Sequence, residues 1–216
     1  MNRLNHLVRS ACLIGALASI AGGASATSAL VGNASNGKAL FSLCATCHGQ
    51  NGEGTQALGG PRLAGQDAWY LTRQLNAFRN GVRGTASGDI LGAQMRPMAL
   101  QLSGDQAVAD AVAYIRTLKS PAAAASGKGN AEHGKALYVV CAACHGPKGA
   151  GLTALNAPRI AGQHAWYLTT QLGNYRNGRR GADVKDAFGM QMAPMAKTLA
   201  NDAAIADVAA YVSGLK

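Results

Sequence analysis

The stretch "CATCHGQNGEG" (residues 44–54) returns 97 positions later as "CAACHGPKGAG" (residues 141–151). Each copy contains C-x-x-C-H, the motif through which a c-type haem is attached to a protein. Two thiols one helical turn apart can both reach the vinyl edge of one porphyrin, and the next histidine can then reach the iron. The motif predicts two covalently bound haem c groups. Their attachment residues are Cys44, Cys47, Cys141 and Cys144, and the first axial ligands are His48 and His145.

Three other interpretations of the CxxC pairs have less support. Disulfides are typical of exported chains, but the histidine after each pair favours haem attachment. A zinc site would join two such pairs about 12 to 20 residues apart, whereas Cys47 and Cys141 are much further apart in sequence. A thioredoxin-like CxxC needs a strand–helix setting, and no convincing strand alternation is present.

The whole chain after its N-terminus is a tandem repeat. Residues 37–119 align with residues 134–216 without a gap, and about half of the aligned positions are identical. This period predicts two like domains rather than a solenoid. Between them, "SPAAAASGKGN" has the composition of a linker. The predicted division is a signal peptide over 1–26, a first domain over 27–119, a linker over 120–130 and a second domain over 131–216.

The fold class that we predict is all-α, with a few helices around a haem in each domain. In the first copy, helices are expected over "GKALFSLC" (37–44), "QDAWYLTRQLNAFRNG" (66–81) and "SGDQAVADAVAYIRTL" (103–118). Ser103 and Gln106 form the pattern of a capping box. Gly-rich loops separate the helices. Because only 5% of the residues are aromatic, a large buried cofactor is expected to complete each core.

The N-terminus predicts export. Arg3 and Arg9 precede a short apolar run, and Ala24-Ser25-Ala26 fits a cleavage site for a secretory signal peptide. The run is too short to span a bilayer. The predicted location is the periplasm, where nucleic acid is not an expected partner. The net charge of +10 suits an acidic protein partner or an anionic membrane surface.

A methionine in each copy is the candidate for the second axial ligand. The motif M-x-P-M occupies residues 95–98 and 192–195, and we expect it at the end of a long loop. A thioether is a soft ligand that suits haem iron and raises its reduction potential. Methionines also fill gaps around apolar groups, so the pattern alone leaves open which methionine of each pair binds iron.

These motifs resemble the dihaem cytochrome c4 family over nearly the whole chain after residue 26. The resemblance rests on the two CxxCH motifs, on "PRLAGQ" and "YLTRQL", and on "MRPMALQLS". It implies that Met95 and Met192 are the axial ligands, with Met98 and Met195 as neighbours. It also implies two domains related by an approximate twofold axis, with the propionate edges of the haems facing each other.

The resemblance implies further contacts around each haem. The histidines are expected to donate to the carbonyls of Pro61 and Pro158, and the first and last helices of each domain to cross at Gly37 and Gly134. Arg62 and Arg159 could offset propionate charge or face water. Four aromatic residues could line the haem or belong to an ordinary core, namely Trp69, Tyr70, Trp166 and Tyr167. His133 and His164 are predicted to be surface residues.

Iron held by histidine and methionine has no open position, so the predicted task is one-electron transfer. The favoured function is a periplasmic dihaem carrier that receives electrons from a membrane quinol-oxidising complex or a dehydrogenase and passes them to a terminal oxidase. The alternatives are an electron-transfer subunit of a periplasmic dehydrogenase complex and a dihaem enzyme such as a peroxidase. Peripheral membrane association is also possible. Arg176, Arg179 and Arg180 form a candidate docking site for an acidic partner.

Overall fold

The computed structural model describes residues 30–125 and 127–216, so the predicted signal peptide lies outside the described residues. The elements in this part of the chain are helical, apart from two isolated bridges that each close a loop. This confirms the all-α fold class. The first half contains α1 (Ala34–His48), η1 (Gln56–Leu58), α2 (Ala68–Arg79), α3 (Ile90–Leu100) and α4 (Gly104–Ile115). The second half contains α5 (Ala131–His145), η2 (Thr153–Leu155), α6 (Ala165–Arg176), α7 (Ala187–Lys197) and α8 (Asp202–Ser213).

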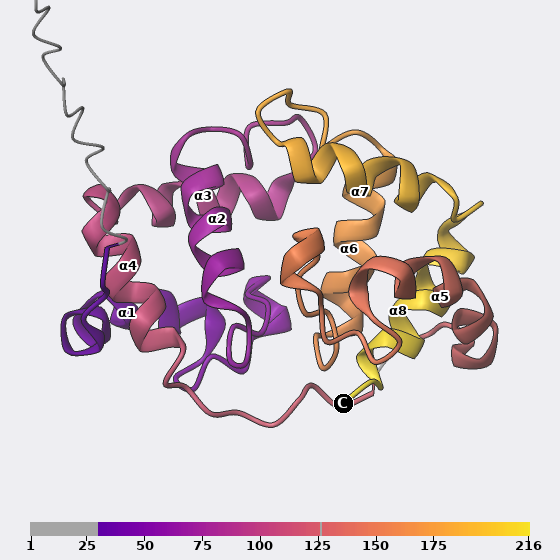
Figure 1. Ribbon diagram of the computed structural model, residues 1–216, viewed down its shortest axis with the longest axis horizontal. Coiled ribbons are helices and arrows are strands. Elements are labelled where there is room, and N and C mark those ends of the chain that lie inside the picture. The colour runs from indigo at the N-terminus through magenta and orange to yellow at the C-terminus, as the bar shows by residue number, and fades with distance from the viewer. Residues whose placement is uncertain (1–29, 126) are drawn as a thin grey trace, which may run out of the picture.

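The two sets of helices form two lobes that lie side by side, joined by an extended segment (Figure 1). In the first lobe α1 packs on α4, and in the second α5 packs on α8 in the same way. The crossing is close because a Cβ atom on Gly37 would lie 1.9 Å from the backbone oxygen of Asp110, and one on Gly134 would lie 2.0 Å from that of Asp207. The expected crossing of the first and last helices is therefore present in both lobes.

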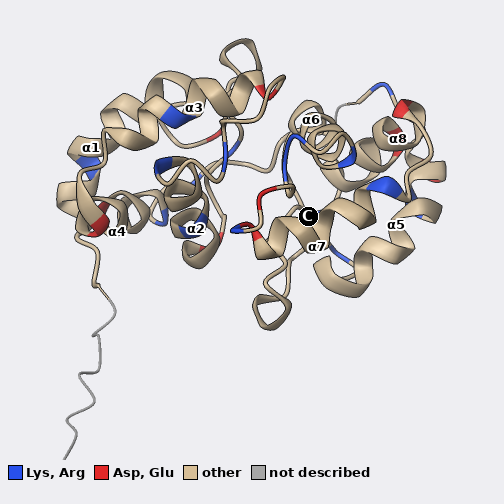
Figure 2. Cartoon of the chain, turned by 90° about the horizontal axis from the view of Figure 1, so that it is seen from above, with Lys and Arg blue, Asp and Glu red and all other residues tan. Residues whose placement is uncertain are grey.

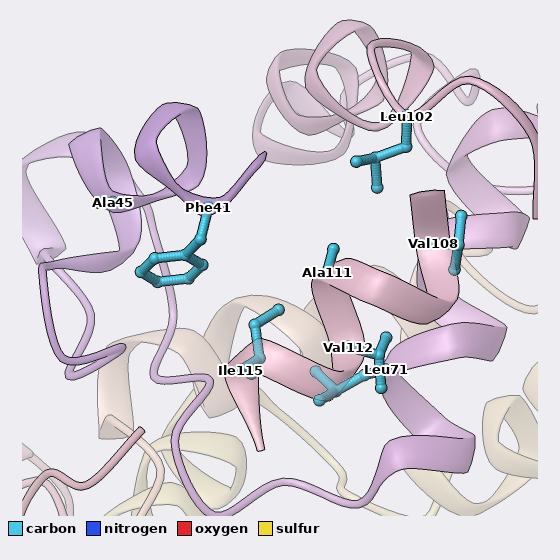
Figure 3. Packing of buried hydrophobic residues seen from close by; sticks show 8 residues of the cluster. All are labelled: Phe41, Ala45, Leu71, Leu102, Val108, Ala111, Val112 and Ile115. Atoms are coloured by element: carbon cyan, nitrogen blue, oxygen red, sulfur yellow. The ribbon is translucent and has the colours of Figure 1, made fainter. Parts of the chain in front are cut away.

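Each lobe has a small core between its first and last helices. In the first lobe it contains Phe41 of α1, Leu71 of α2 and the apolar face of α4 (Figure 3). Tyr138 of α5 takes the place of Phe41 in the second lobe. Their rings contact the tyrosine of the last helix with centroids 5.3 Å apart in both lobes, a distance typical of favourable aromatic pairs.

The last helices of the two lobes, α4 and α8, differ in how their N-termini are capped. Ser103 is the N-cap of α4, but its side chain makes no cap hydrogen bond, and the Gln106 side chain instead donates to Val31 and Asp110. The predicted capping box is therefore wrong. In α8 the side chain of Asn201 accepts from the amide of Ala204 at 2.9 Å, as expected.

The M-x-P-M motifs lie inside helices, not in loops as we expected. An aspartate caps each helix, because Asp89 accepts from the amide of Gly92 at 3.1 Å and Asp186 from that of Gly189 at 2.9 Å. Pro97 and Pro194 follow in the second half of α3 and α7. A proline there removes one hydrogen bond without ending the helix at once. No helix between residues 30 and 216, where described, is long and apolar enough to cross a membrane.

Candidate haem sites

The last turn of α1 and the last turn of α5 carry the CxxCH residues. Within α1, Cys44 stands three residues before Cys47 and four before His48, so all three lie on one helical face. Gly49 ends the helix with a positive φ of 79°, a conformation that favours glycine. The second lobe repeats this arrangement with Gly146, whose φ is 77°.

Both histidines have one ring nitrogen occupied and one available. Nδ1 of His48 donates to the carbonyl of Pro61 at 2.8 Å, and Nδ1 of His145 donates to the carbonyl of Pro158 at 2.9 Å. These are the bonds that the family resemblance implied. Burial lowers the pKa of both histidines, against the opposing effect of the carbonyl. Nε2 is therefore unprotonated near neutral pH and can bind a metal.

The four motif cysteines form no disulfide with one another, so all four can serve for haem attachment. Burial raises the pKa of the Cys44 and Cys141 thiols, which keeps them protonated. In residues 30–125 and 127–216 no group of three or more His, Cys, Asp and Glu side chains lies close enough to hold a metal ion.

One continuous cavity is lined by the motif residues of both lobes. Apolar side chains of the cores form much of its wall, including Leu71 and Phe78 in the first lobe. All four methionines of the M-x-P-M motifs reach it. Met95 and Met192 are half-buried, whereas Met98 and Met195 are exposed to 37% and 38%. The more protected methionine of each pair is therefore the one that the family resemblance selects.

Two buried arginines meet in this cavity at the boundary between the lobes. The Arg83 guanidinium donates to Gln74 of its own lobe at 2.7 Å and to Gln171 of the other lobe at 3.0 Å. Arg180 makes the equivalent bonds to Gln171 at 2.8 Å and to Gln74 at 2.9 Å. The two glutamine oxygens thus each accept from both arginines. Such reciprocal contacts are expected when two like domains are related by an approximate twofold axis.

The charges of these arginines fit a haem propionate. Neither makes an ion pair with a carboxylate in the described part of the chain, and the Nε atoms of both are buried without a hydrogen-bond partner. A buried cation needs an anion or several acceptors. Burial opposes the charge of Arg180, but the nearby hydroxyl groups of Tyr175, Tyr70 and Tyr167 outweigh it and raise its pKa. The donors present therefore suit the carboxylate groups of a haem bound in each lobe.

Several expectations about single residues are wrong. Arg180 is 6% exposed at the lobe boundary and cannot belong to a surface docking site. The alternatives for Arg62, contact with a propionate or exposure to water, both stay predictions; its guanidinium donates to the linker residues Ser120 and Pro121. His164 is half-buried and lies 2.8 Å from the carbonyl oxygen of Glu53, across the lobe boundary. His133, in contrast, has an exposed side chain that contacts Asp207, as expected of a surface residue.

The aromatic residues divide into two groups. Tyr70 and Tyr167 line the cavity and their hydroxyl groups accept from Arg180 and Arg83. Trp69 and Trp166 pack beside them, with buried Nε1 atoms that have no partner. The role of Arg83 was not predicted from the sequence. Its only signal was its recurrence as Arg180 within "FRNGVRG" and "YRNGRRG".

The fold and the two sites define a c-type cytochrome with two covalently attached haem groups. Residues 34–119 and residues 131–216 each match the family model described as cytochrome c. A cytochrome c4 of Azotobacter vinelandii is 34% identical over 196 residues, which cover 85% of this chain and 90% of that protein. The chain belongs to the dihaem cytochrome c4 family.

Two further comparisons bear on its structure and role. The crystal structure of reduced recombinant cytochrome c4 from Pseudomonas stutzeri superposes with a TM-score of 0.69 and 29% identity, covering 86% of this chain and all of that one (100%). A thiosulfate dehydrogenase electron acceptor of Stutzerimonas stutzeri (strain A1501) is 40% identical over 158 residues, 68% of each protein. The chain is thus similar to dihaem electron carriers.

Proposed function

We propose that this dihaem carrier is exported to the periplasm and binds each iron between one histidine and one methionine. The ligand pairs are His48 with Met95 and His145 with Met192. The observation that carries this proposal is the half-buried methionine in each lobe, on the wall of the cavity that also holds the histidine. Thioether sulfur with imidazole nitrogen is the ligand set of electron-carrying c-type cytochromes.

The residues of the chain prepare the site for electron transfer rather than for substrate chemistry. Haem supplies a one-electron couple between ferric and ferrous iron. The histidine ring is fixed by the Pro61 or Pro158 carbonyl, so its orientation does not change with the charge of the iron. Two protein ligands leave no place for a substrate, and the apolar wall limits the access of water.

The proposed place in the chain of carriers is between a membrane quinol-oxidising complex or dehydrogenase and a terminal oxidase. Lys and Arg residues occur along both lobes (Figure 2), and their excess over Asp and Glu favours acidic partners or a peripheral position on an anionic membrane. Arg179 is exposed in the second lobe and remains available for such contacts. Arg176 is held by Asp202, and Arg180 is buried.

A second candidate partner is a thiosulfate dehydrogenase. The observation that favours it is the 40% identity to a relative described as the electron acceptor of that enzyme. This candidate corresponds to the alternative role in a dehydrogenase complex. Both roles use the same two haem sites, so they differ only in the donor.

The axial ligands are tested by the near-infrared absorption that arises between methionine sulfur and ferric haem iron. The oxidised holoprotein should show two equivalents of this band. Met95→Ala and Met192→Ala should each remove one, whereas the matched variants Met98→Ala and Met195→Ala should retain both. Loss of a band in either matched variant would assign that methionine as the ligand instead. Fewer than two bands in the unaltered protein would favour the enzyme alternative.

The donor is tested by stopped-flow reduction of the oxidised holoprotein. A thiosulfate dehydrogenase with thiosulfate, and a quinol-oxidising complex with quinol, are compared at equal concentration and low ionic strength. If the donor is the quinol-oxidising complex, reduction by that complex should be the faster, followed by oxidation by a terminal oxidase. Faster reduction by the dehydrogenase would support the second candidate.

A further inference from the structure

The corresponding helices α2 and α6 differ in charge at one position of the lobe boundary. Tyr70 and Gln74 of α2 recur as Tyr167 and Gln171 of α6. Arg73 lies between the first two, but its counterpart in α6 is Thr170. At this position the approximate twofold symmetry of the boundary is therefore broken by a positive charge.

Arg73 extends from its own lobe into the second one. Its guanidinium donates to the carbonyl of Asn156 at 3.1 Å, and its central carbon lies 4.4 Å from the centroid of the Phe188 ring. Asn156 belongs to the loop between His145 and Pro158, and Phe188 lies in the first turn of α7, the helix that carries Met192. Arg73 also lines the common cavity. It thus lies among the residues that surround the second haem site.

The charge of Arg73 is only partly balanced. Within the described residues no carboxylate lies within 4.0 Å of its nitrogens, and its Nη1 atom is buried without a hydrogen-bond partner. Asp186 attracts it from a greater distance, while the carboxylate of that residue caps α7 at Gly189. The indole of Trp69 contributes a cation–π contact at 4.7 Å. These contacts hold the cation in place without neutralising it.

The equivalent position next to the first haem site has no charge. The hydroxyl group of Thr170 donates to the carbonyl of Trp166 within its own helix, at 2.9 Å. Its side chain is also too short to carry a charge across the boundary. At the position that corresponds to Arg73, the second lobe therefore brings no positive charge to the first haem site.

We propose that the positive charge of Arg73, a residue of the first domain, raises the reduction potential of the haem in the second domain. Reduction adds one electron to a haem, and a nearby fixed cation stabilises the reduced state more than the oxidised state. The effect depends on the docked arrangement of the lobes, because Arg73 reaches the second site only across their boundary. The proposal rests on both haems being bound, and not on the identity of any redox partner.

Other unmatched arginines act on the same pair of haems. Arg96 follows Met95 directly, where the second lobe has Ala193, and Arg179 has Val82 as its counterpart. The order of the two potentials depends on all of these charges. The contribution of Arg73 is measurable on its own, because its contacts with the second lobe predict a larger effect on the second haem than on the first.

The test is a redox titration of the holoprotein in which NMR resonances of each haem report its own midpoint. In Arg73→Gln, the equilibrium constant for placing a single electron on the second haem rather than the first should fall about tenfold, the order of magnitude expected for loss of one nearby, partly buried unit charge. For a one-electron couple this is about 59 mV. The midpoint of the first haem should shift by less than that of the second.

Two variants separate charge from packing. Arg73→Lys keeps the charge and should restore most of the second-haem potential. Arg79→Gln removes a charge from the same helix that already pairs with the exposed Asp105 carboxylate, and should shift neither midpoint. Equal shifts at both haems in Arg73→Gln, no shift at either, or an Arg73→Lys variant that behaves like Arg73→Gln would overturn the proposal. Absorption at each stage shows whether both haems are bound, so a failure of haem attachment is recognised separately.

Discussion

At the scale of single residues, Gly37 shows how little space separates α1 from α4. A methyl group there would lie 1.9 Å from the Asp110 backbone oxygen and 2.8 Å from Cβ of Tyr114. Backbone atoms in the middle of a helix cannot move away independently, so the two helices would have to separate. Because α1 ends in the haem attachment residues, this contact also determines where they lie.

Gly37→Ala is therefore expected to destabilise the holoprotein by about 1–3 kcal/mol, the usual cost of overpacking. Urea unfolding measures this through the shift of the midpoint. The matched control is Gly173→Ala in α6, where nothing lies within 4 Å of the added atom. The control should gain about 0.5–1 kcal/mol, because alanine is the better helix former. A Gly37→Ala protein as stable as the control would show that the helices separate easily.

The residues of the haem sites differ in how far local sequence could predict them. Cys44, Cys47 and His48 occupy one helical turn, so their spacing alone brings them together. Arg83 and Arg180 come together only when the lobes dock, and their recurrence in the repeat does not show that they meet. The two arginines of "GRRG" were instead predicted to lie on the surface, where arginine is usually found.

At the scale of secondary-structure elements, Asp110 joins α4 to the N-terminal end of α1. Its buried carboxylate accepts from the backbone amide of Asn33 at 2.7 Å and from the Gln106 side chain at 2.7 Å. The hydrogen bond from the backbone N–H of Asn33 is the main cause that lowers the pKa of Asp110, and the hydrogen bond from the Gln106 side chain is the next. In the second lobe Asp207 binds the amide of Asn130 and the His133 ring in the same way.

This arrangement predicts a pH-dependent stability. A carboxyl group with a lowered folded-state pKa stabilises the fold above its unfolded pKa of about 3.9 and loses this effect as the pH falls through the folded value. Asp110→Asn should therefore be destabilised at about pH 7 and lose less of its remaining stability on acidification than the unaltered protein. Urea unfolding at several pH values measures both effects. Asp105→Asn, an exposed acid with a surface partner, should leave the pH profile nearly unchanged. Parallel profiles for Asp110→Asn and the unaltered protein would contradict the prediction.

The helices themselves were predictable where their apolar spacing was regular, as in α2 and α4. The helices α3 and α7 were not, because Gly and Pro suggested a loop around Met95 and Met192. The signal for these helices was an aspartate followed by glycine three residues later, at Asp89 and Asp186. That signal is weak, because an aspartate with a nearby glycine is equally typical of a turn. Tertiary contact with α2 and α6 then stabilises both helices.

At the scale of the whole molecule, the tandem repeat predicted two like domains, and an approximate twofold relation came only from the resemblance. The reciprocal bonds agree with that relation, since Gln66 donates to the carbonyl of Arg159 and Gln163 to that of Arg62, both at 2.9 Å. What the repeat could not predict is which faces meet. That choice depends on side chains from segments about 100 residues apart, which have no common local pattern.

The centre of this boundary gives the last prediction. The side-chain oxygen of Gln171 accepts from Arg83 at 3.0 Å and from Arg180 at 2.8 Å. Gln171→Ala would leave two buried guanidinium groups with one acceptor fewer each, at a cost of about 1–3 kcal/mol per unsatisfied group. Because the bond to Arg83 crosses the boundary, the cost weakens docking of the lobes more than the fold of either one.

Hydrogen exchange of the holoprotein measures this difference. Amides of α2 and α6 should exchange at least about tenfold faster in Gln171→Ala, because 1.4 kcal/mol corresponds to a tenfold change in an opening equilibrium. Amides where α1 crosses α4 should keep their rates. Gln50→Ala, at an exposed position of the first lobe, is the matched control and should change neither set. Unchanged exchange in α2 and α6 would mean that other contacts hold the lobes together, among them the reciprocal bonds of Gln66 and Gln163. A uniform acceleration of exchange in all helices would instead show that Gln171 stabilises the fold of its lobe and not only the docking of the two lobes.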